Sequence, residues 1–160
     1  MHTKVTTRQE LASRLEARRR QGQRIVFTNG CFDLMHIGHI RYLQAARNLG
    51  DVLVVGVNSD ESVRALNKGT DRPIVPDAQR AEVLAALACV DYVVTFSEPD
   101  PGALIATLQP DILVKGGDWS VDRIVGRETV EARGGRVQTI PLVPGVSTTT
   151  LVQRIRSTTA

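Results

Sequence analysis

The fold is decided by residues 24–39, which read RIVFTNGCFDLMHIGH. The apolar, β-branched run at 24–28 is typical of a buried strand, and Asn29-Gly30 predicts a turn directly after it. Apolar residues at helical spacing then run over 38–48. Strand, turn and helix in this order indicate the first unit of an open α/β sheet, in which ligands bind beyond the carboxyl ends of the strands.

The alternation continues on both sides of this unit. A capping box at 7–10 predicts a helix that Gly22 ends. Later strands are predicted at 52–57, 92–96, 112–115 and 137–140, and later helices at 77–88, 102–108, 124–132 and 148–156. The pattern therefore predicts one α/β domain with a parallel sheet, residues 1–160, made of a helical extension at 1–23 and a core at 24–157. The irregular stretch at 67–76, rich in Gly, Pro and basic residues, is expected to be a functional loop.

Composition limits the class of protein. The chain has 160 residues, 42% hydrophobic and 23% charged, which is enough for one core that needs no disulfide or metal. No apolar run approaches the roughly 20 residues that span a bilayer, and the N-terminus lacks a signal-peptide core. Cys31 and Cys89 are isolated in sequence and are expected to be reduced thiols. We therefore expect a cytoplasmic protein.

Charge gives little support for nucleic-acid binding. Twenty Lys and Arg against 17 Asp and Glu leave a net charge of +3. Much of the excess lies in one cluster, formed by Arg14, Arg18, Arg19, Arg20 and Arg24. No aromatic residues are interleaved with these arginines as stacking platforms, so we expect a solvated helix end and no nucleic-acid partner.

Two histidines mark the predicted ligand turn. The turn lacks both the G-x-G-x-x-G and the P-loop patterns, which disfavours hydride-transfer cofactors and P-loop hydrolysis. His36 and His39 flank Gly38 where the helix begins, so two imidazoles lie beside free backbone N–H groups at the positive end of the helix dipole. This arrangement favours an anion site over the alternative that both side chains only cap the helix. No metal site is expected, because the two histidines have no third His or Cys ligand in the sequence near them, and Asp33 alone would not complete a site.

These residues resemble the H-x-G-H signature of the cytidylyltransferase-like nucleotidyltransferases, whose fold is Rossmann-like, a parallel sheet with helices on both faces. A second segment, Gly145-Val146-Ser147-Thr148-Thr149, is similar to the second nucleotide-binding signature of that superfamily. The second signature often carries Arg or Lys three residues after its last Thr. Here that position is Val152, with Arg154 as the nearest cation.

Within the superfamily the chain resembles the D-glycero-β-D-manno-heptose 1-phosphate adenylyltransferases over about residues 24–157. The segments that carry this likeness are 57–60, Lys68-Gly69, Arg72-Pro73, Gln79-Arg80, 90–93 and 113–119. The resemblance implies transfer of AMP from ATP to heptose 1-phosphate, which gives ADP-heptose and pyrophosphate for the lipopolysaccharide core. In many bacteria the activity is fused to a sugar kinase, and 160 residues predict the stand-alone form.

The resemblance also implies roles for single residues. The catalytic, phosphate-binding residues are His36, His39 and Lys68. Other nucleotide contacts are expected from Cys31, Phe32, Gly117, Gly145, Val146, Ser147, Thr148 and Thr149. Acceptor contacts are expected from Asp33, Arg72, Lys115, Asp118 and Trp119. Two choices stay open. Asp33 either orients a histidine or a metal-bound water, or it only caps the turn. Ser147 to Thr149 either bind the nucleotide or act only as a helix cap.

Cofactor and assembly follow from the same resemblance. Mg²⁺ is expected with ATP, because it neutralises the triphosphate and keeps most of its waters, so it needs few protein ligands. A homodimer is expected, with the first helix and Asp91-Tyr92-Val93 as candidate contact surfaces. The alternatives are a cytidylyltransferase or adenylyltransferase for another phosphorylated acceptor, such as glycerol 3-phosphate, and a non-catalytic nucleotide- or nucleic-acid-binding module.

Overall fold

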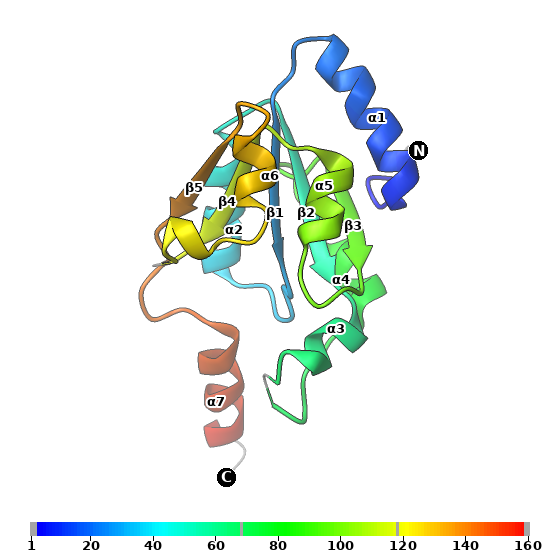
Figure 1. Ribbon diagram of the computed structural model, residues 1–160. Helices are drawn as coiled ribbons and strands as arrows, with labels where there is room; N and C mark the ends of the chain where they lie inside the picture. The colour runs from blue at the N-terminus through cyan, green and yellow to red at the C-terminus, as the bar shows by residue number, and fades with distance from the viewer. Residues whose placement is uncertain (1–2, 68, 118, 159–160) are drawn as a thin grey trace.

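The computed structural model describes residues 3–67, 69–117 and 119–158. Five parallel strands form one sheet in the order β3-β2-β1-β4-β5 (Figure 1). The strands are β1 Ile25–Gly30, β2 Val52–Asn58, β3 Tyr92–Phe96, β4 Ile112–Gly116 and β5 Arg136–Ile140. β1 lies at the centre, and the chain first extends the sheet on the β2 side and then returns to the β4 side. The order therefore reverses between β1 and β4, and the carboxyl ends of these two strands flank the expected ligand site.

The register of β1 corrects one prediction. Asn29 and Gly30 do not form a turn but stay in the strand, paired with Gly56 and Val57 of β2. The reason is that β2 runs to Asn58 and offers a partner for every residue of β1. The turn that carries the histidines therefore begins only after Gly30.

Helices cover both faces of the sheet, which confirms the predicted fold class. They are α1 Arg8–Arg20, α2 Ile37–Arg47, α3 Asp60–Ala65, α4 Asp77–Ala85, α5 Gly102–Leu108, α6 Arg127–Glu131 and α7 Thr148–Thr158, with the 3-10 turn η1 Val121–Arg123. One core cluster joins α1, α5 and α6 to one face of the sheet, and a second joins α2 and α4 to the other. Alternate residues of β1 divide between them, with Phe27 in the first cluster and Val26 in the second.

Helix ends differ from the prediction in places. α3 and η1 were not predicted, because six and three residues are too short to show a helical period. α4 ends at Ala85 rather than 88, and α6 begins at Arg127 rather than 124. The N-cap of α4 is Pro76, and the helix begins at Asp77 as predicted.

The first helix packs into the core and against the edge of the sheet. Leu11 and Leu15 are fully buried, and Thr7 caps the helix by accepting the N–H of Glu10. Arg18 donates to the hydroxyl of Tyr92 on β3. The two surfaces expected to contact a second copy are therefore in contact with each other inside one chain.

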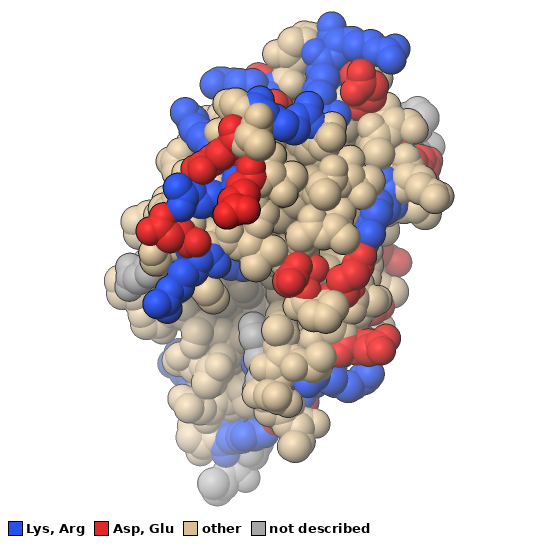
Figure 2. All heavy atoms as spheres, viewed as in Figure 1, with Lys and Arg blue, Asp and Glu red and all other residues tan. Residues whose placement is uncertain are grey.

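The described surface carries charges of both signs. On the face shown in Figure 2, basic and acidic side chains are interleaved, and the arginines of α1 pair with neighbouring carboxylates, as in Arg14–Glu10 and Arg19–Glu16. Both cysteines are free thiols. Among the described residues, no helix is long and apolar enough to cross a membrane.

Candidate active site

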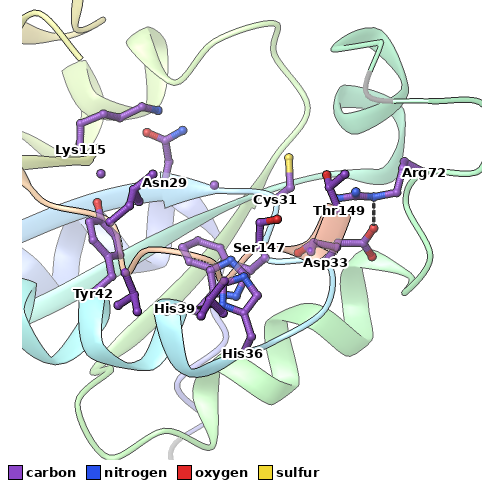
Figure 3. Close-up of a pocket in the computed structure, with 18 residues that line it drawn as sticks. Asn29, Cys31, Asp33, His36, His39, Tyr42, Arg72, Lys115, Ser147 and Thr149 are labelled. Carbon is purple, nitrogen blue, oxygen red and sulfur yellow. Dashed lines mark hydrogen bonds and ion pairs between the residues drawn. The ribbon is translucent and has the colours of Figure 1, made fainter. Parts of the chain in front are cut away.

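A cavity of about 590 Å³ opens at the carboxyl edge of the sheet, between the ends of β1 and β4 and the start of α7 (Figure 3). Its walls come from segments that are far apart in sequence: the turn after β1, the loop before α4, the end of β4 and the segment after β5. The predicted site residues that line it are Cys31, Phe32, Asp33, His36, His39, Arg72, Lys115, Val146, Ser147, Thr148 and Thr149.

The other predicted site residues lie elsewhere. Gly117 and Trp119 line an adjacent cavity of about 350 Å³, which shares Gly116 and Leu142 with the first. Gly145 lines neither cavity. Lys68 and Asp118 fall outside the residues that the structure describes.

Sequence reasoning missed several lining residues, namely Asn29, Gly30, Tyr42, Leu142 and Val143. A signal existed for Tyr42, which follows His39 by three positions and so shares its helix face. Leu142 and Val143 carried no signal, because two apolar residues between a strand and a Gly turn are typical of many connections.

The histidine turn ends in a helix cap. His36 is the N-cap of α2, and its Nδ1 accepts the N–H of His39 at 3.4 Å. In the neutral ring the proton then lies on Nε2, which makes His36 a hydrogen-bond donor on its far side. Burial lowers the pKa of His36, so the neutral ring is the favoured form at pH 7. The capping alternative is thus correct for His36, and it is compatible with anion binding because capping uses only Nδ1.

The two imidazoles act as one surface over the start of α2. Their rings stack with centroids 3.8 Å apart and planes 19° apart, and Phe32 lies against His39 at 5.3 Å. Gly38 makes the stack possible, because a Cβ there would lie 2.9 Å from the His36 ring. Phe32 itself takes a left-handed backbone with φ of 49°, which is uncommon outside glycine and is typical of functional turns.

The second signature opens α7 on the opposite wall. The Ser147 hydroxyl accepts the N–H of Thr150 at 3.0 Å, so Ser147 caps this helix as the cap alternative expected. The Thr148 hydroxyl donates to the carbonyl of Leu34, which ties α7 to the histidine turn. The cavity therefore lies between the N-termini of two helices of 11 residues each, whose dipoles both favour an anion.

Asp33 holds the loop before α4. Its carboxylate accepts the N–H groups of Ile74 and Val75 at 2.9 Å and the Nε of Arg72 at 2.5 Å. Burial acts to raise the pKa of Asp33, but the hydrogen bonds of Val75, Ile74 and Arg72 outweigh it and hold this pKa below its ordinary value. In the structure Asp33 therefore orients neither histidine; it fixes Arg72 at the cavity wall.

The lining residues favour a negatively charged ligand. Asp33 is the one described carboxylate among them and pairs with Arg72, so Lys115 gives the described lining a net positive charge. Lys115 lies 5.5 Å from the centre of the Trp119 ring. Neither Val152 nor Arg154 lines the cavity, so in the described residues its cations come from a different loop and from β4.

Tyr42 forms part of the wall beside Gly116, at the end of β4. Its hydroxyl lies 2.6 Å from that of Thr28, and its ring meets the place where Gly116 has no side chain. Burial raises the pKa of Tyr42 to about 12, so the hydroxyl is neutral at physiological pH and serves packing and hydrogen bonding.

A sequence model describing cytidylyltransferase-like proteins matches residues 27–154 of this chain. The bifunctional protein HldE of Syntrophotalea carbinolica is 56% identical over 153 residues, which cover 96% of this chain and 31% of the relative. The HldE protein of Geotalea uraniireducens is 54% identical over 154 residues, with 96% and 31% covered. The chain spans about a third of the length of these curated relatives.

Solved structures show the same architecture. The lipopolysaccharide core biosynthesis protein of Thermoplasma volcanium has a TM-score of 0.64 and 30% identity, over 76% of this chain and 98% of its own. A pantoate-beta-alanine ligase from Francisella tularensis has a TM-score of 0.57 at 17% identity, over 86% of this chain and 66% of its own, which is a likeness of fold alone.

Proposed function

We propose that this chain, which belongs to the cytidylyltransferase-like family, transfers AMP from ATP to D-glycero-β-D-manno-heptose 1-phosphate, with ADP-heptose and pyrophosphate as products. The family membership indicated by the two signatures is confirmed by the match over residues 27–154.

One observation carries the proposal. The two signature segments, more than 100 positions apart in sequence, meet across one cavity at the point where the strand order reverses. Each segment opens a helix toward that cavity, and the imidazoles, Arg72 and Lys115 add hydrogen-bond donors and positive charge. Such a site is suited to a triphosphate, whose negative charge is spread over several oxygens.

The chemistry needs alignment more than a base. An oxygen of the acceptor phosphate attacks the α-phosphorus of ATP, a new P–O bond forms, and the bond from the α-phosphorus to the bridging oxygen of pyrophosphate breaks. A sugar phosphate dianion is already a nucleophile at pH 7, so no proton has to be removed from it. We propose that the Nε2–H of His36, the ring of His39 and the N–H groups at the start of α2 bind the phosphoryl oxygens, and that Arg72 binds the negative charge of the substrates.

Mg²⁺ is proposed to enter with the nucleotide. Among the described residues there is no group of three His, Cys, Asp or Glu side chains able to hold a metal ion, and Asp33 is saturated by three donors. A metal held chiefly by phosphate oxygens and water fits this site, because Mg²⁺ keeps most of its waters. When bound, it would neutralise part of the triphosphate charge.

The choice of a heptose acceptor rests on the relatives. The HldE proteins are similar to this chain over almost its whole length, and the Thermoplasma protein is named for lipopolysaccharide core biosynthesis. The second cavity, with the exposed ring of Trp119, is a suitable place for a sugar beside the phosphate site. Since ATP and sugar phosphates are cytoplasmic metabolites, we propose that the protein acts in the cytoplasm. We also propose that it is a homodimer, the oligomeric state that the family resemblance implies.

The test is pyrophosphate release from ATP and CTP, each with heptose 1-phosphate and with glycerol 3-phosphate. We expect turnover with ATP and heptose 1-phosphate to exceed the other three pairs. The variant with both His36→Asn and His39→Asn is the control for contaminating activity. Preferred turnover of CTP or glycerol 3-phosphate would change the assignment within the family, and no release from any pair would support a binding module.

A further inference from the structure

Arg80, on α4, is a fully buried cation behind the wall of the active-site cavity. Its side chain is the largest of the fully buried ones, with 1% of the residue exposed. Nε donates to the carbonyl of Val75 at 2.8 Å, Nη1 to the carbonyl of Cys31 at 2.6 Å, and Nη2 to the carboxylate of Asp60 at 2.8 Å. The guanidinium therefore joins three segments of the chain at once.

The charge of Arg80 is balanced by a small network. Asp60 and Asp77 exchange hydrogen bonds between N–H groups and carboxylates, at 3.0 and 2.9 Å, where α3 and α4 begin. Asp60 is thereby held in place to meet Arg80. A buried charge is stable only when it is paired and hydrogen-bonded, and here each of the three guanidinium nitrogens of Arg80 has an acceptor.

Arg80 and Asp33 hold the same residue from opposite sides. Asp33 accepts the N–H of Val75, while Arg80 donates to the carbonyl of Val75. Arg80 also binds the carbonyl of Cys31, which lies two positions before Asp33 in the histidine turn. The contacts close a ring from the turn to the loop and back, which we call the Arg80 brace: Cys31, Asp33, Val75 and Arg80.

The brace fixes two parts of the site relative to each other. One part is the turn that leads to His36 and His39, and the other is the loop that carries Arg72 to the cavity wall. Without Arg80, the hydrogen bonds that connect the described residues of the loop to the turn would be those of Asp33. Arg80 does not itself line the cavity, so it has no direct route to the substrates.

We propose that Arg80 is a positioning residue of the nucleotidyltransferase site, which acts by holding the Arg72 loop in register with the histidine turn. The inference rests on the proposed function for its catalytic consequence, and on the geometry alone for its structural one. Because a misplacement of about 1 Å can cost about 100-fold in rate, a loosened brace is expected to lower kcat more than it raises the KM of ATP.

The test variant is Arg80→Lys, which keeps a positive charge for Asp60 but lacks the planar fork that reaches both carbonyls. Its matched control is Arg47→Lys. Arg47, near the other end of α2, also donates to a carbonyl, that of Gly50 at 2.7 Å, and pairs with Asp91 at 3.1 Å. Thermal melting of both variants first confirms that each is folded at the assay temperature.

Two measurements follow, only one of which needs catalysis. Hydrogen exchange should show faster exchange of the Ile74 and Val75 amides in Arg80→Lys and no change there in Arg47→Lys. Pyrophosphate release should fall by about 10- to 100-fold in kcat for Arg80→Lys and by less than about twofold for Arg47→Lys. If the folded Arg80→Lys variant retains the wild-type exchange and kcat, the proposal is wrong.

A double variant separates positioning from general stability. Asp33→Asn weakens the other side of the brace, so its effect on kcat should add only in part to that of Arg80→Lys, because the two side chains share Val75 while Asp33 also holds Ile74 and Arg72. Full additivity would show independent actions and would overturn the proposal. If the wild-type chain has no turnover with any substrate pair, the proposed function fails, and the exchange measurement still decides whether Arg80 holds the loop.

Discussion

Replacing His36 separates two roles that the structure assigns to one side chain. Its Nδ1 caps α2, and this leaves its Nε2–H available as a hydrogen-bond donor. His36→Ala removes both roles. His36→Asn keeps a side-chain oxygen that can accept the N–H of His39, since Asn is among the best N-cap residues, but it removes the imidazole.

The His36 cap makes a modest contribution to the free energy of unfolding. An N-cap contributes about 0.5–2 kcal/mol, and the 3.4 Å bond, which is longer than usual, places His36 near the lower end. For a chain of this size a loss of about 0.5–1 kcal/mol lowers Tm by about 1–4 °C. We therefore expect His36→Ala to melt about 1–4 °C below wild type, and His36→Asn to melt close to it.

Catalysis should follow the other role. Losing one preorganised donor to a transition state lowers kcat by about 10²–10³-fold, and both His36→Ala and His36→Asn should show that loss. The assay is steady-state pyrophosphate release, with thermal melting of the same samples. If His36→Asn keeps near-wild-type kcat, His36 is only a helix cap and the reasoning is refuted.

Four further outcomes are expected. Burial lowers the pKa of His36 from 6.5, so the unfolded chain takes up a proton at this residue more readily than the folded chain. The stability that the neutral His36 contributes is therefore lost as pH falls below about 6.5. Between about pH 7 and pH 5, the Tm of wild type should fall more than the Tm of His36→Asn. Asp33→Asn should lower the free energy of unfolding by about 1–3 kcal/mol in urea titration, because it leaves buried donors such as Arg72 poorly paired; an unchanged value would contradict the role of Asp33. ATP should slow hydrogen exchange in the loop at 67–76, except at the amides of Ile74 and Val75, which are already bonded to Asp33; equal exchange with and without ATP would make the loop a passive connection. Light scattering should give a dimer, and a mass near 17.5 kDa would exclude it.

The sequence alone determined most of the local elements and the two ends of the site. Apolar runs predicted β3 from Tyr92 to Phe96 and α5 from Gly102 to Leu108 with the bounds that the structure shows. The histidine signature and the Ser-Thr-Thr segment predicted two helix starts, because capping depends on neighbours within four positions. These features are local, so their signal is contained in short stretches of sequence.

Tertiary structure decided what meets in the cavity. Strand order is not written in any one segment, and only the placing of β1 between β2 and β4 brings the histidine turn opposite α7. The same packing gives Asp33 its partners in the loop about 40 positions away and surrounds Arg80 with three acceptors. Hydrogen bonds between distant segments form only after the sheet has set their distance, so no spacing in the sequence could reveal them.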